Sequence, residues 1–406
     1  MSAKSLRIAA SVALFVISTV ATSGHAQTSH YDELANAQFS GDFPNSGSAE
    51  LLKDELYFQR AVQVYLWSLP AVNIFAMKEG SEKTYGAGLL PVWKERLNAK
   101  TKVTTPNSDC LYAMGYVNLA KDRPTVVKVP PNNQGIFDDF FQRPLTGPTI
   151  DGKAFTGDFG FAGPDSGKGG KYLLVPWDYK GPSPSGYYHY RSRTNNVLVF
   201  YRAFFTDPKD LGPANQLIAG TRIYPFGKRD TAAPMRFPDG SAMPAYMLFP
   251  QDGSYFDMLA HFVDEETVDP ADMDWRGMMA TLGIAKGKPF QPTAHQRELL
   301  DKAAKTAFKM SKVEIWDELV NQPGGKYYPD RQWENVFAGQ NPLFQASGTF
   351  TNLVQRDAYF TSAYATSPGM VVDLIEKGAK SPSSSEHSSC QFLVGHGLQL
   401  DHSLGA

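Results

Sequence analysis

Residues 104–119 read TTPNSDCLYAMGYVNL, and this stretch decides how the first half of the chain folds. Its beginning is turn chemistry, because Pro106 fixes a backbone φ angle and the three residues after it, Asn107 to Asp109, can each bond neighbouring backbone. The remainder alternates, with one face made of Leu111, Ala113, Gly115, Val117 and Leu119 and the other of Tyr112, Met114, Tyr116 and Asn118. The stretch therefore predicts a polar knot, residues 104–109, that leads into a strand with almost no polar face.

The region around this strand, residues 101–205, is β-rich. Further strands are expected at TVVKV (125–129), KYLLV (171–175), YYHYR (187–191) and NVLVFYRAF (196–204). The turn at 121–124 is expected to fold the strand that ends at Leu119 onto TVVKV as a hairpin. These spacings favour an antiparallel sandwich or barrel over repeated βαβ units.

Helices are expected on both sides of the β-rich region. An apolar face predicts a helix from Glu50 to Ser68, limited by Pro70. Residues 254–266 and 293–319 also read as helices, the second with Thr293 as its N-cap, and a short helix between them is expected to end at Gly283. The predicted fold class is α+β: an antiparallel β-sandwich or barrel-like first domain, helical N-terminal and connector segments, and an incomplete second β domain.

The first residues indicate export. Lys4 and Arg7 precede the apolar run IAASVALFVISTVA, and small residues lead to an expected cleavage near Ala26. We expect a soluble periplasmic or secreted protein with no membrane span once this segment is removed. The expected divisions are a signal peptide at 1–26, a helical segment at 27–100, a β-rich domain at 101–235, a helical connector at 236–320, the start of a second domain at 321–379, and a disordered or frame-shifted tail at 380–406.

Composition limits the partners. The chain has 406 residues and a formal net charge of −2, which argues against nucleic acid as the main partner. The two cysteines, Cys110 and Cys390, imply neither a disulfide framework nor a zinc site, and Cys110 is expected to be a small core residue. No histidine pair has metal-ligand spacing, so no metal and no cofactor are expected.

Several segments resemble the exported bacterial proteins built from domain of unknown function 1254 followed by domain of unknown function 1214. These segments are TPNSDCLY, the run GPDSGKGGKYLLVPWDYKGPSPSGYYHYRSRTNNV with Arg202 after it, LGIAKGKPF, and QRDAYFTSAYATSPGMV at 355–371. The resemblance covers roughly residues 40–379. It implies a β-sandwich-like first domain, a helical connector and a second β domain, but no defined activity.

The sequence departs from this resemblance after Gly378. Similar proteins continue with a β domain rich in Tyr, Trp and Gly, whereas this chain runs into a Ser- and His-rich tail. A truncation or reading-frame shift near Lys380 is the favoured interpretation, and a short natural variant is the alternative.

The polar knot is the first candidate site. On local evidence Asn107 and Asp109 form an Asx-type turn that starts a strand. Because the knot is also the most characteristic part of the resemblance, we hypothesise that Asn107, Asp109 and Tyr112 line a pocket at one end of the first β domain.

Other polar residues of this domain extend the candidate site. Arg143, Arg193 and Arg202 are candidates because an arginine can hold a carboxylate through two parallel hydrogen bonds. Two carboxylates among Asp109, Asp139 and Asp151 would suit acid–base chemistry or a hard cation. For each arginine the alternative is an ion pair, and for each aspartate a turn.

Three functional hypotheses remain open. The leading one is an exported protein that binds a small polar or carboxylate-bearing ligand in the first β domain. The second is a hydrolase or lyase that acts through Asp109 with a nearby Tyr or Arg, so the sequence leaves open whether the protein is an enzyme. The third is a truncated fragment without independent function, whose exposed strand edges favour self-association, and a homo-oligomer stays open.

Overall fold

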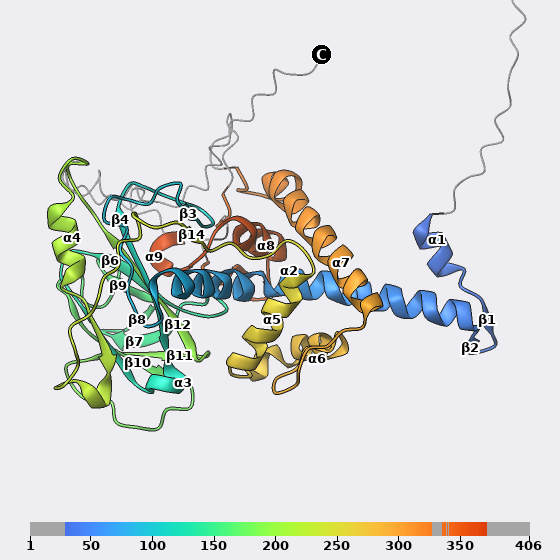
Figure 1. Ribbon diagram of the computed structural model, residues 1–406, viewed down its shortest axis with the longest axis horizontal. Coiled ribbons are helices and arrows are strands. Elements are labelled where there is room, and N and C mark those ends of the chain that lie inside the picture. The colour runs from blue at the N-terminus through green and yellow to red at the C-terminus, as the bar shows by residue number, and fades with distance from the viewer. Residues whose placement is uncertain (1–28, 327–334, 338, 340, 372–406) are drawn as a thin grey trace, which may run out of the picture. The chain divides into compact units, whose positions relative to one another are not determined.

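The computed structural model describes residues 29–326, 335–337, 339 and 341–371 (Figure 1). The expected signal peptide, Cys390 and the expected tail lie outside these residues. The chain divides into two compact units, Met1–Glu55 and Leu56–Ala406. In the first unit, a capping box at Ser29 starts helix α1 (His30–Ala35), and β1 (Phe39–Ser40) pairs with β2 (Phe43–Pro44).

Helix α2 (Ser46–Tyr85) is much longer than expected, and the prediction that Pro70 limits it was wrong. A proline inside a helix removes one N–H and disturbs the preceding turn. Here other segments bond the backbone around the proline: the Gln142 side chain donates to the Pro70 carbonyl at 2.7 Å, and Arg356 donates to the Trp67 carbonyl at 2.6 Å. These tertiary contacts and the burial of the helix outweigh the local signal to stop.

Two sheets form the β domain. The six-stranded sheet has the order β13-β5-β10-β11-β7-β8 and the four-stranded sheet the order β4-β12-β6-β9. Their bounds are β4 Leu111–Asn118, β5 Thr125–Val129, β6 Gln134–Asp139, β7 Thr146–Ile150, β8 Lys153–Thr156, β9 Asp158–Gly160, β10 Gly170–Pro176, β11 Tyr188–Ser192, β12 Asn196–Ala203 and β13 Arg222–Pro225. All pairings in these sheets are antiparallel except that of β10 with β11. The α+β class is confirmed, and the sheets do not close into a barrel.

Strand β4 lies between two hydrophobic cores, as its two apolar faces predict. Leu111, Ala113 and Val117 belong to the core shared by the two sheets. Tyr112 and Met114 belong to the core that the four-stranded sheet shares with α2 and other helices. Cys110 is fully buried in that second core, which confirms the expectation of a core residue.

The expected hairpin between β4 and β5 was wrong, because the two strands belong to different sheets. Helix α3 (Leu119–Asp122) connects them, and the Asn118 side chain caps it by accepting from Lys121 N at 2.9 Å. Every residue of β4 pairs with β12, from Leu111 opposite Ala203 to Asn118 opposite Asn196. The local turn signal therefore marks a crossing between sheets.

The helices expected between residues 254 and 319 are confirmed. Helix α5 (Ser254–Glu265) is followed by η2 (Pro270–Asp272) and α6 (Met273–Thr281), and Gly283 follows with φ of +89°. Thr293 caps α7 (Ala294–Val313) with a complete capping box, and a π-helical turn, η3 (Glu314–Leu319), continues it. Side chains of α5 and α7 share one core with α2, and Figure 1 shows these helices beside it.

Side chains of the described residues after Asn335, such as Phe344 and Tyr359, belong to the same core. The division into two β domains stays a prediction. This part of the chain contains β15 (Gln345–Ala346), β16 (Phe350–Thr351), α8 (Leu353–Ser362) and α9 (Pro368–Val371).

Smaller elements elsewhere are α4 (Gly212–Ala219), η1 (Phe226–Lys228), and the parallel pair of β3 (Thr101–Lys102) with β14 (Ala245–Tyr246). Among the described residues, no helix has the length and apolar character needed to cross a bilayer.

Candidate functional site

The polar knot is a partly exposed turn. The Asn107 side-chain carbonyl accepts a hydrogen bond from Asp109 N at 2.7 Å, and the Thr105 hydroxyl donates to the Ser362 carbonyl at 2.7 Å. Asp109 is exposed, and its carboxylate makes no hydrogen bond or ion pair within the described parts of the chain. This geometry fits the Asx-turn interpretation, and no Tyr or Arg among the described residues makes a hydrogen bond or ion pair with Asp109.

Two substitutions distinguish between the Asx-turn interpretation of the polar knot and a ligand site. Asn107→Ala removes the acceptor of the turn and is expected to lower the free energy of unfolding by about 1 kcal/mol. Asp109→Ala leaves that hydrogen bond in place, because Asp109 contributes its backbone N–H, and is expected to change the free energy by less than about 0.5 kcal/mol. Urea unfolding measures both values. A larger loss for Asp109→Ala than for Asn107→Ala would contradict the turn interpretation.

Tyr112 and Arg202 are brought together, but inside the protein. They face each other across β4 and β12 and are 2% and 6% exposed. The Tyr112 ring stacks on Phe200 with 5.2 Å between ring centroids, and the Arg202 guanidinium lies 5.5 Å from the same ring. Tyr364 contacts the other side of this group through an edge-on contact with Phe200. The pair is therefore covered by the chain itself.

Two buried carboxylates on the same face of the four-stranded sheet bind the segment that follows Tyr364, residues 366–369. Asp138 accepts from Thr366 N at 2.8 Å, and Asp158 accepts from the Ser367 hydroxyl at 2.6 Å and from Gly369 N at 2.8 Å. Burial raises the pKa of Asp158 to about 6 and the pKa of Asp138 well above its ordinary value. Their role in the described structure is to fasten residues 366–369 to the sheet.

Arg143 and Arg193 also come together, in an ion-pair network. The Arg143 side chain lies 3.1 Å from an Asp139 oxygen, 3.4 Å from Asp272 and 3.9 Å from Asp269, and Arg193 lies 3.8 Å from the same Asp269 oxygen. Three carboxylates therefore neutralise Arg143 already. Asp151 lies apart in the turn between β7 and β8, with a φ of +50°. The ion-pair and turn alternatives fit these residues better than a carboxylate clamp.

An arrangement that the sequence reasoning missed lies on the six-stranded sheet. Lys171 on β10 pairs directly with Lys128 on β5, which pairs directly with Arg222 on β13. Their neighbours Val127, Val129 and Tyr172 point into the core between the sheets, so these three exposed cations project from the opposite face. We call Lys171, Lys128 and Arg222 the cation row.

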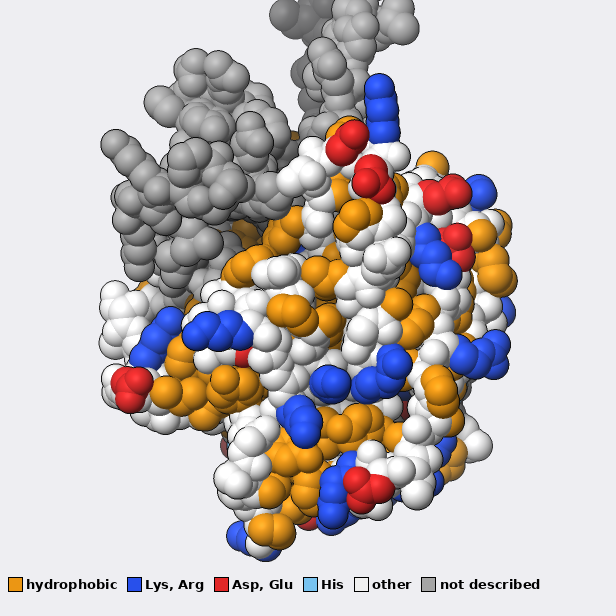
Figure 2. Space-filling view, turned by 90° about the vertical axis from the view of Figure 1, so that its left-hand side faces the viewer, with side chains coloured by type: hydrophobic (Ala, Val, Ile, Leu, Met, Phe, Trp, Pro, Cys, Tyr) orange, Lys and Arg blue, Asp and Glu red, His pale blue; other side chains and the backbone are white. Residues whose placement is uncertain are grey.

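No acidic residue balances the cation row from its own sheet. None of the six strands contains Asp or Glu, and the cation row makes no ion pair with any described residue. Arg222 donates through Nη1 to the Ala219 and Thr221 carbonyls, which leaves the rest of its guanidinium available. Figure 2 views the side of the molecule on which the two sheets lie: Lys and Arg side chains gather around hydrophobic ones in its lower part, and acidic side chains are scattered over the rest of the face.

Aromatic side chains flank the cation row. Val126 on β5 and Leu173 on β10 lie two residues from Lys128 and Lys171, so they share the outer face with them. The side chains of Tyr187, Tyr224 and Phe226 pack over these two residues. Lys171 lies 5.6 Å from the Tyr187 ring centroid, and the Tyr187 and Phe226 rings meet edge-on. The outer face thus joins a charged row to a half-buried aromatic strip. Each of the three strands carries only one of these cations, and only strand register shows that the cations are neighbours.

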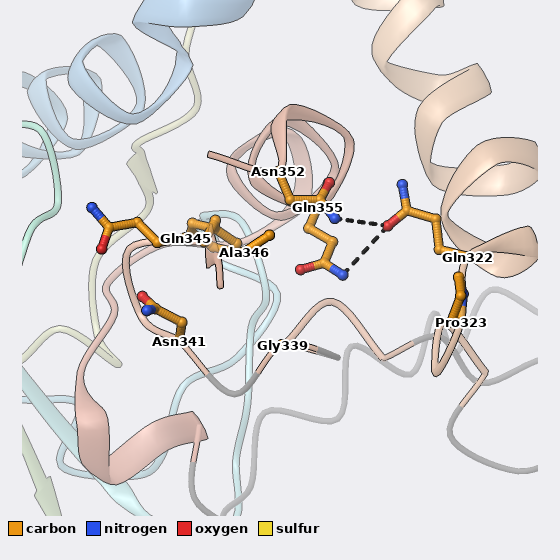
Figure 3. A pocket seen from close by; sticks show the side chains of 9 residues that line it. Gln322, Pro323, Gly339, Asn341, Gln345, Ala346, Asn352 and Gln355 are labelled. Carbon is orange, nitrogen blue, oxygen red and sulfur yellow. Dashed lines mark hydrogen bonds between the residues drawn. The ribbon is translucent and has the colours of Figure 1, made fainter. Parts of the chain in front are cut away.

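A second arrangement is a pocket rich in side-chain amides, shown in Figure 3. Asn352 and Gln355 both donate to the Gln322 side-chain oxygen, at 2.9 and 3.4 Å. Asn352 also caps α8, and the Asn341 side chain accepts from Leu343 N at 2.8 Å. These amides are thus engaged in holding local structure, which makes the pocket a weaker candidate than the cation row.

Comparison with known proteins adds a family without an assigned activity. Residues 89–225 match the model of a family described as a protein of unknown function (DUF1254), and this range contains the polar knot and the whole cation row. No curated protein matches the chain.

Similar solved structures are also uncharacterised. The VPA0106 protein from Vibrio parahaemolyticus is 17% identical, with 66% of this chain and 60% of that chain covered and a TM-score of 0.44. A putative uncharacterized protein from Burkholderia cenocepacia is 14% identical, with 65% and 59% covered and a TM-score of 0.22. The chain thus spans about three fifths of the length of these structures.

Proposed function

We propose that this chain is a binding protein whose β domain holds a ligand with two or three anionic groups on the cation row. The observation that carries the proposal is the direct pairing of Lys171 with Lys128 and of Lys128 with Arg222. Like charges directly opposite each other on neighbouring strands are destabilising, by up to about 1 kcal/mol for a pair. An anionic ligand would remove this repulsion, so the arrangement costs stability in the free protein and contributes affinity in the complex.

The spacing of the cations limits the ligand. Neighbouring strands lie about 4.8 Å apart, so the three side chains rise from a line about 10 Å long. A single small anion would meet one or two of them, whereas a ligand with carboxylate, sulfate or phosphate groups in series would meet all three. The adjacent strip of Tyr187, Tyr224 and Phe226 gives such a ligand an apolar surface for rings or hydrocarbon parts.

Substitution of the central cation tests the proposal. Lys128→Ala is expected to weaken binding of tripolyphosphate or trigalacturonate at least tenfold, because the middle charge contacts both halves of a linear anion. The same change is expected to leave the free protein as stable as before or slightly more stable, since it removes two repulsive pairs. Calorimetric titration measures the affinity, and thermal unfolding without ligand measures the stability.

Lys153→Ala is the matched control, because Lys153 is an exposed lysine of the same sheet on the far edge strand, β8. Lys153→Ala is expected to bind tripolyphosphate and trigalacturonate as tightly as the unchanged protein does. Raising the salt concentration from about 0.05 M to about 0.5 M is expected to weaken binding to the unchanged protein, because the contacts are exposed and screened. Equal losses for Lys128→Ala and Lys153→Ala would show general attraction to the sheet, and no binding of either probe would refute the proposal.

We also propose that the protein acts after export, in the periplasm or outside the cell. The pattern of charge, apolar run and small residues in the first 26 residues supports this. The similarity of residues 355–371 to domain of unknown function 1214 is proposed on the same basis of sequence resemblance. Expression of the full chain with N-terminal sequencing of the mature protein tests the location, and an uncleaved chain retained in the cytoplasm would contradict it.

A further inference from the structure

A pocket of about 310 Å³ lies at the C-terminal end of α2, away from the residues of the cation row. Its lining residues are Thr84, Tyr85, Arg236, Phe237, Pro238 and Met243. Phe237, Pro238 and Met243 supply its apolar part, and the Met243 side chain is 45% exposed, so it is accessible to a ligand. The volume is at the lower end of the range of about 300–1,000 Å³ that holds small ligands.

The walls of the pocket are firmly held. Val92 N donates to the Pro238 carbonyl at 2.9 Å, and Gly240 N donates to the Val92 carbonyl at 2.8 Å. The Tyr85 hydroxyl donates to the Gly240 carbonyl at 3.3 Å, which joins α2 to the same segment. A Cβ on Gly240 would lie 2.7 Å from the Trp93 ring, so the segment is packed against the core. A pocket with walls this constrained loses little conformational entropy when a ligand binds.

Arg236 is the charged group of the pocket. It is exposed and, within the described parts of the chain, makes no ion pair, in contrast to Arg143 with its three carboxylates. A guanidinium can bind a carboxylate through two parallel hydrogen bonds. The nearest acidic residue in sequence, Asp239, accepts from Ser241 N at 2.9 Å and so turns toward its own backbone.

Another part of the pocket lining, at the end of α2, repels anions. Thr84 and Tyr85 are the last residues of α2, where the helix dipole places partial negative charge. Burial raises the pKa of Tyr85, a hydrogen bond with Thr101 lowers it, and the Asp239 charge contributes a smaller rise. An acidic group therefore has one favourable position, at Arg236, and the rest of the ligand must lie over Phe237 and Met243.

We infer that this pocket binds a small monocarboxylic acid with an apolar body, oriented with its carboxylate on Arg236. This site is independent of the cation row, because it takes a single charge and an apolar group where the row takes several charges in series. Benzoate and 3-phenylpropionate are suitable probes, and benzamide is the uncharged analogue of the first.

The test is titration of the full chain with these probes by calorimetry or NMR. The unchanged protein is expected to bind 3-phenylpropionate at least tenfold more tightly than Arg236→Met does, and to bind benzoate more tightly than benzamide. Arg229→Met is the matched control, since Arg229 is an exposed arginine outside the pocket lining that pairs with Asp230. It is expected to leave the affinities for 3-phenylpropionate and benzoate unchanged.

A second variant tests the apolar wall. Met243→Ala is expected to weaken the binding of benzoate and the binding of benzamide by similar factors, because it removes contact area and no charge. Equal binding of 3-phenylpropionate to Arg236→Met and to the unchanged protein would overturn the inference. So would equal losses for Arg236→Met and Arg229→Met, which would indicate general attraction of anions to the surface.

Discussion

Gly80→Ala is expected to destabilise the protein by about 3 kcal/mol, although alanine is the better helix former by about 1 kcal/mol. Gly80 lies inside α2, where β14 crosses the helix. A Cβ at this position would be 2.0 Å from the Tyr246 carbonyl oxygen and 3.1 Å from the Met247 Cα. These are backbone atoms, and Met247 N is bonded to the Lys102 carbonyl at 2.8 Å, so the crossing segment cannot move away without losing that pairing.

Gly277→Ala provides the matched control. Gly277 lies inside α6 and a Cβ there would meet no atom within 4 Å. The same substitution is therefore expected to stabilise the protein by about 0.5–1 kcal/mol, through helix propensity alone. Urea unfolding of both variants checks the opposite signs. A neutral or stabilising effect of Gly80→Ala would show that β14 does not pack against α2 as described.

Local periodicity predicted those parts of the fold that depend on neighbouring residues. The alternation from Leu111 to Asn118 predicted both faces of β4, because successive side chains of a strand must point to opposite sides. Thr293 predicted the start of α7 for a similar reason, since a capping box needs only the three residues that follow the cap. These predictions required no knowledge of the rest of the chain.

Predictions failed where distant residues decide. Pro70 reads as a helix end, but Gln142 and Arg356 bond the backbone around it from positions far along the chain. The turn at 121–124 reads as a hairpin, but β12 is the partner of β4 along its whole length. In both cases the tertiary contacts outweigh a local preference of a few kcal/mol.

The candidate site shows the same difference between what local sequence predicts and what distant residues decide. Arg143 was chosen because its guanidinium suits a carboxylate, and it does bind carboxylates, but two of them are Asp269 and Asp272 of the helical connector. Residue type predicted the chemistry, but the sequence does not show that Asp269 and Asp272 lie beside Arg143. The cation row was missed for the complementary reason, because Lys128 and Lys171 become neighbours only through the register of β5 with β10.

The free energy of unfolding is expected to fall as the pH rises from about 4.5 to 8. Several carboxyl groups have a raised pKa in the folded protein, with burial as the largest cause: Asp158 and Asp357 to about 6, Glu266 to about 7, Glu314 to about 8, and Asp138 well above its ordinary value. In this range the folded state holds protons that the unfolded state has released. Stability is therefore greatest below the ordinary pKa of these groups and is lost as the pH rises through the folded values.

Glu266 indicates the size of the effect. Its carboxyl group is fully buried and accepts hydrogen bonds from the Asn195 and Asn196 backbone and from the Asn196 side chain, which lower its pKa by less than burial raises it. A rise from 4.5 to about 7 corresponds to about 3 kcal/mol, because one pKa unit is worth about 1.4 kcal/mol. The lowered pKa values of Glu298 and Asp301 act below this window and do not oppose the trend.

Asp138→Asn tests the trend at one buried carboxyl group. Asp138 is 0% exposed, and its Oδ1 has no hydrogen-bond partner within the described parts of the chain, so its charged form is poorly stabilised. The variant cannot ionise, and urea unfolding at pH 5, 6, 7 and 8 is expected to show a smaller fall in stability than in the unchanged protein. Asp109→Asn, at an exposed carboxylate, is expected to keep the full fall. A stability that rises with pH, or equal slopes for Asp138→Asn and the unchanged protein, would show that Asp138 carries no proton in the folded state at neutral pH.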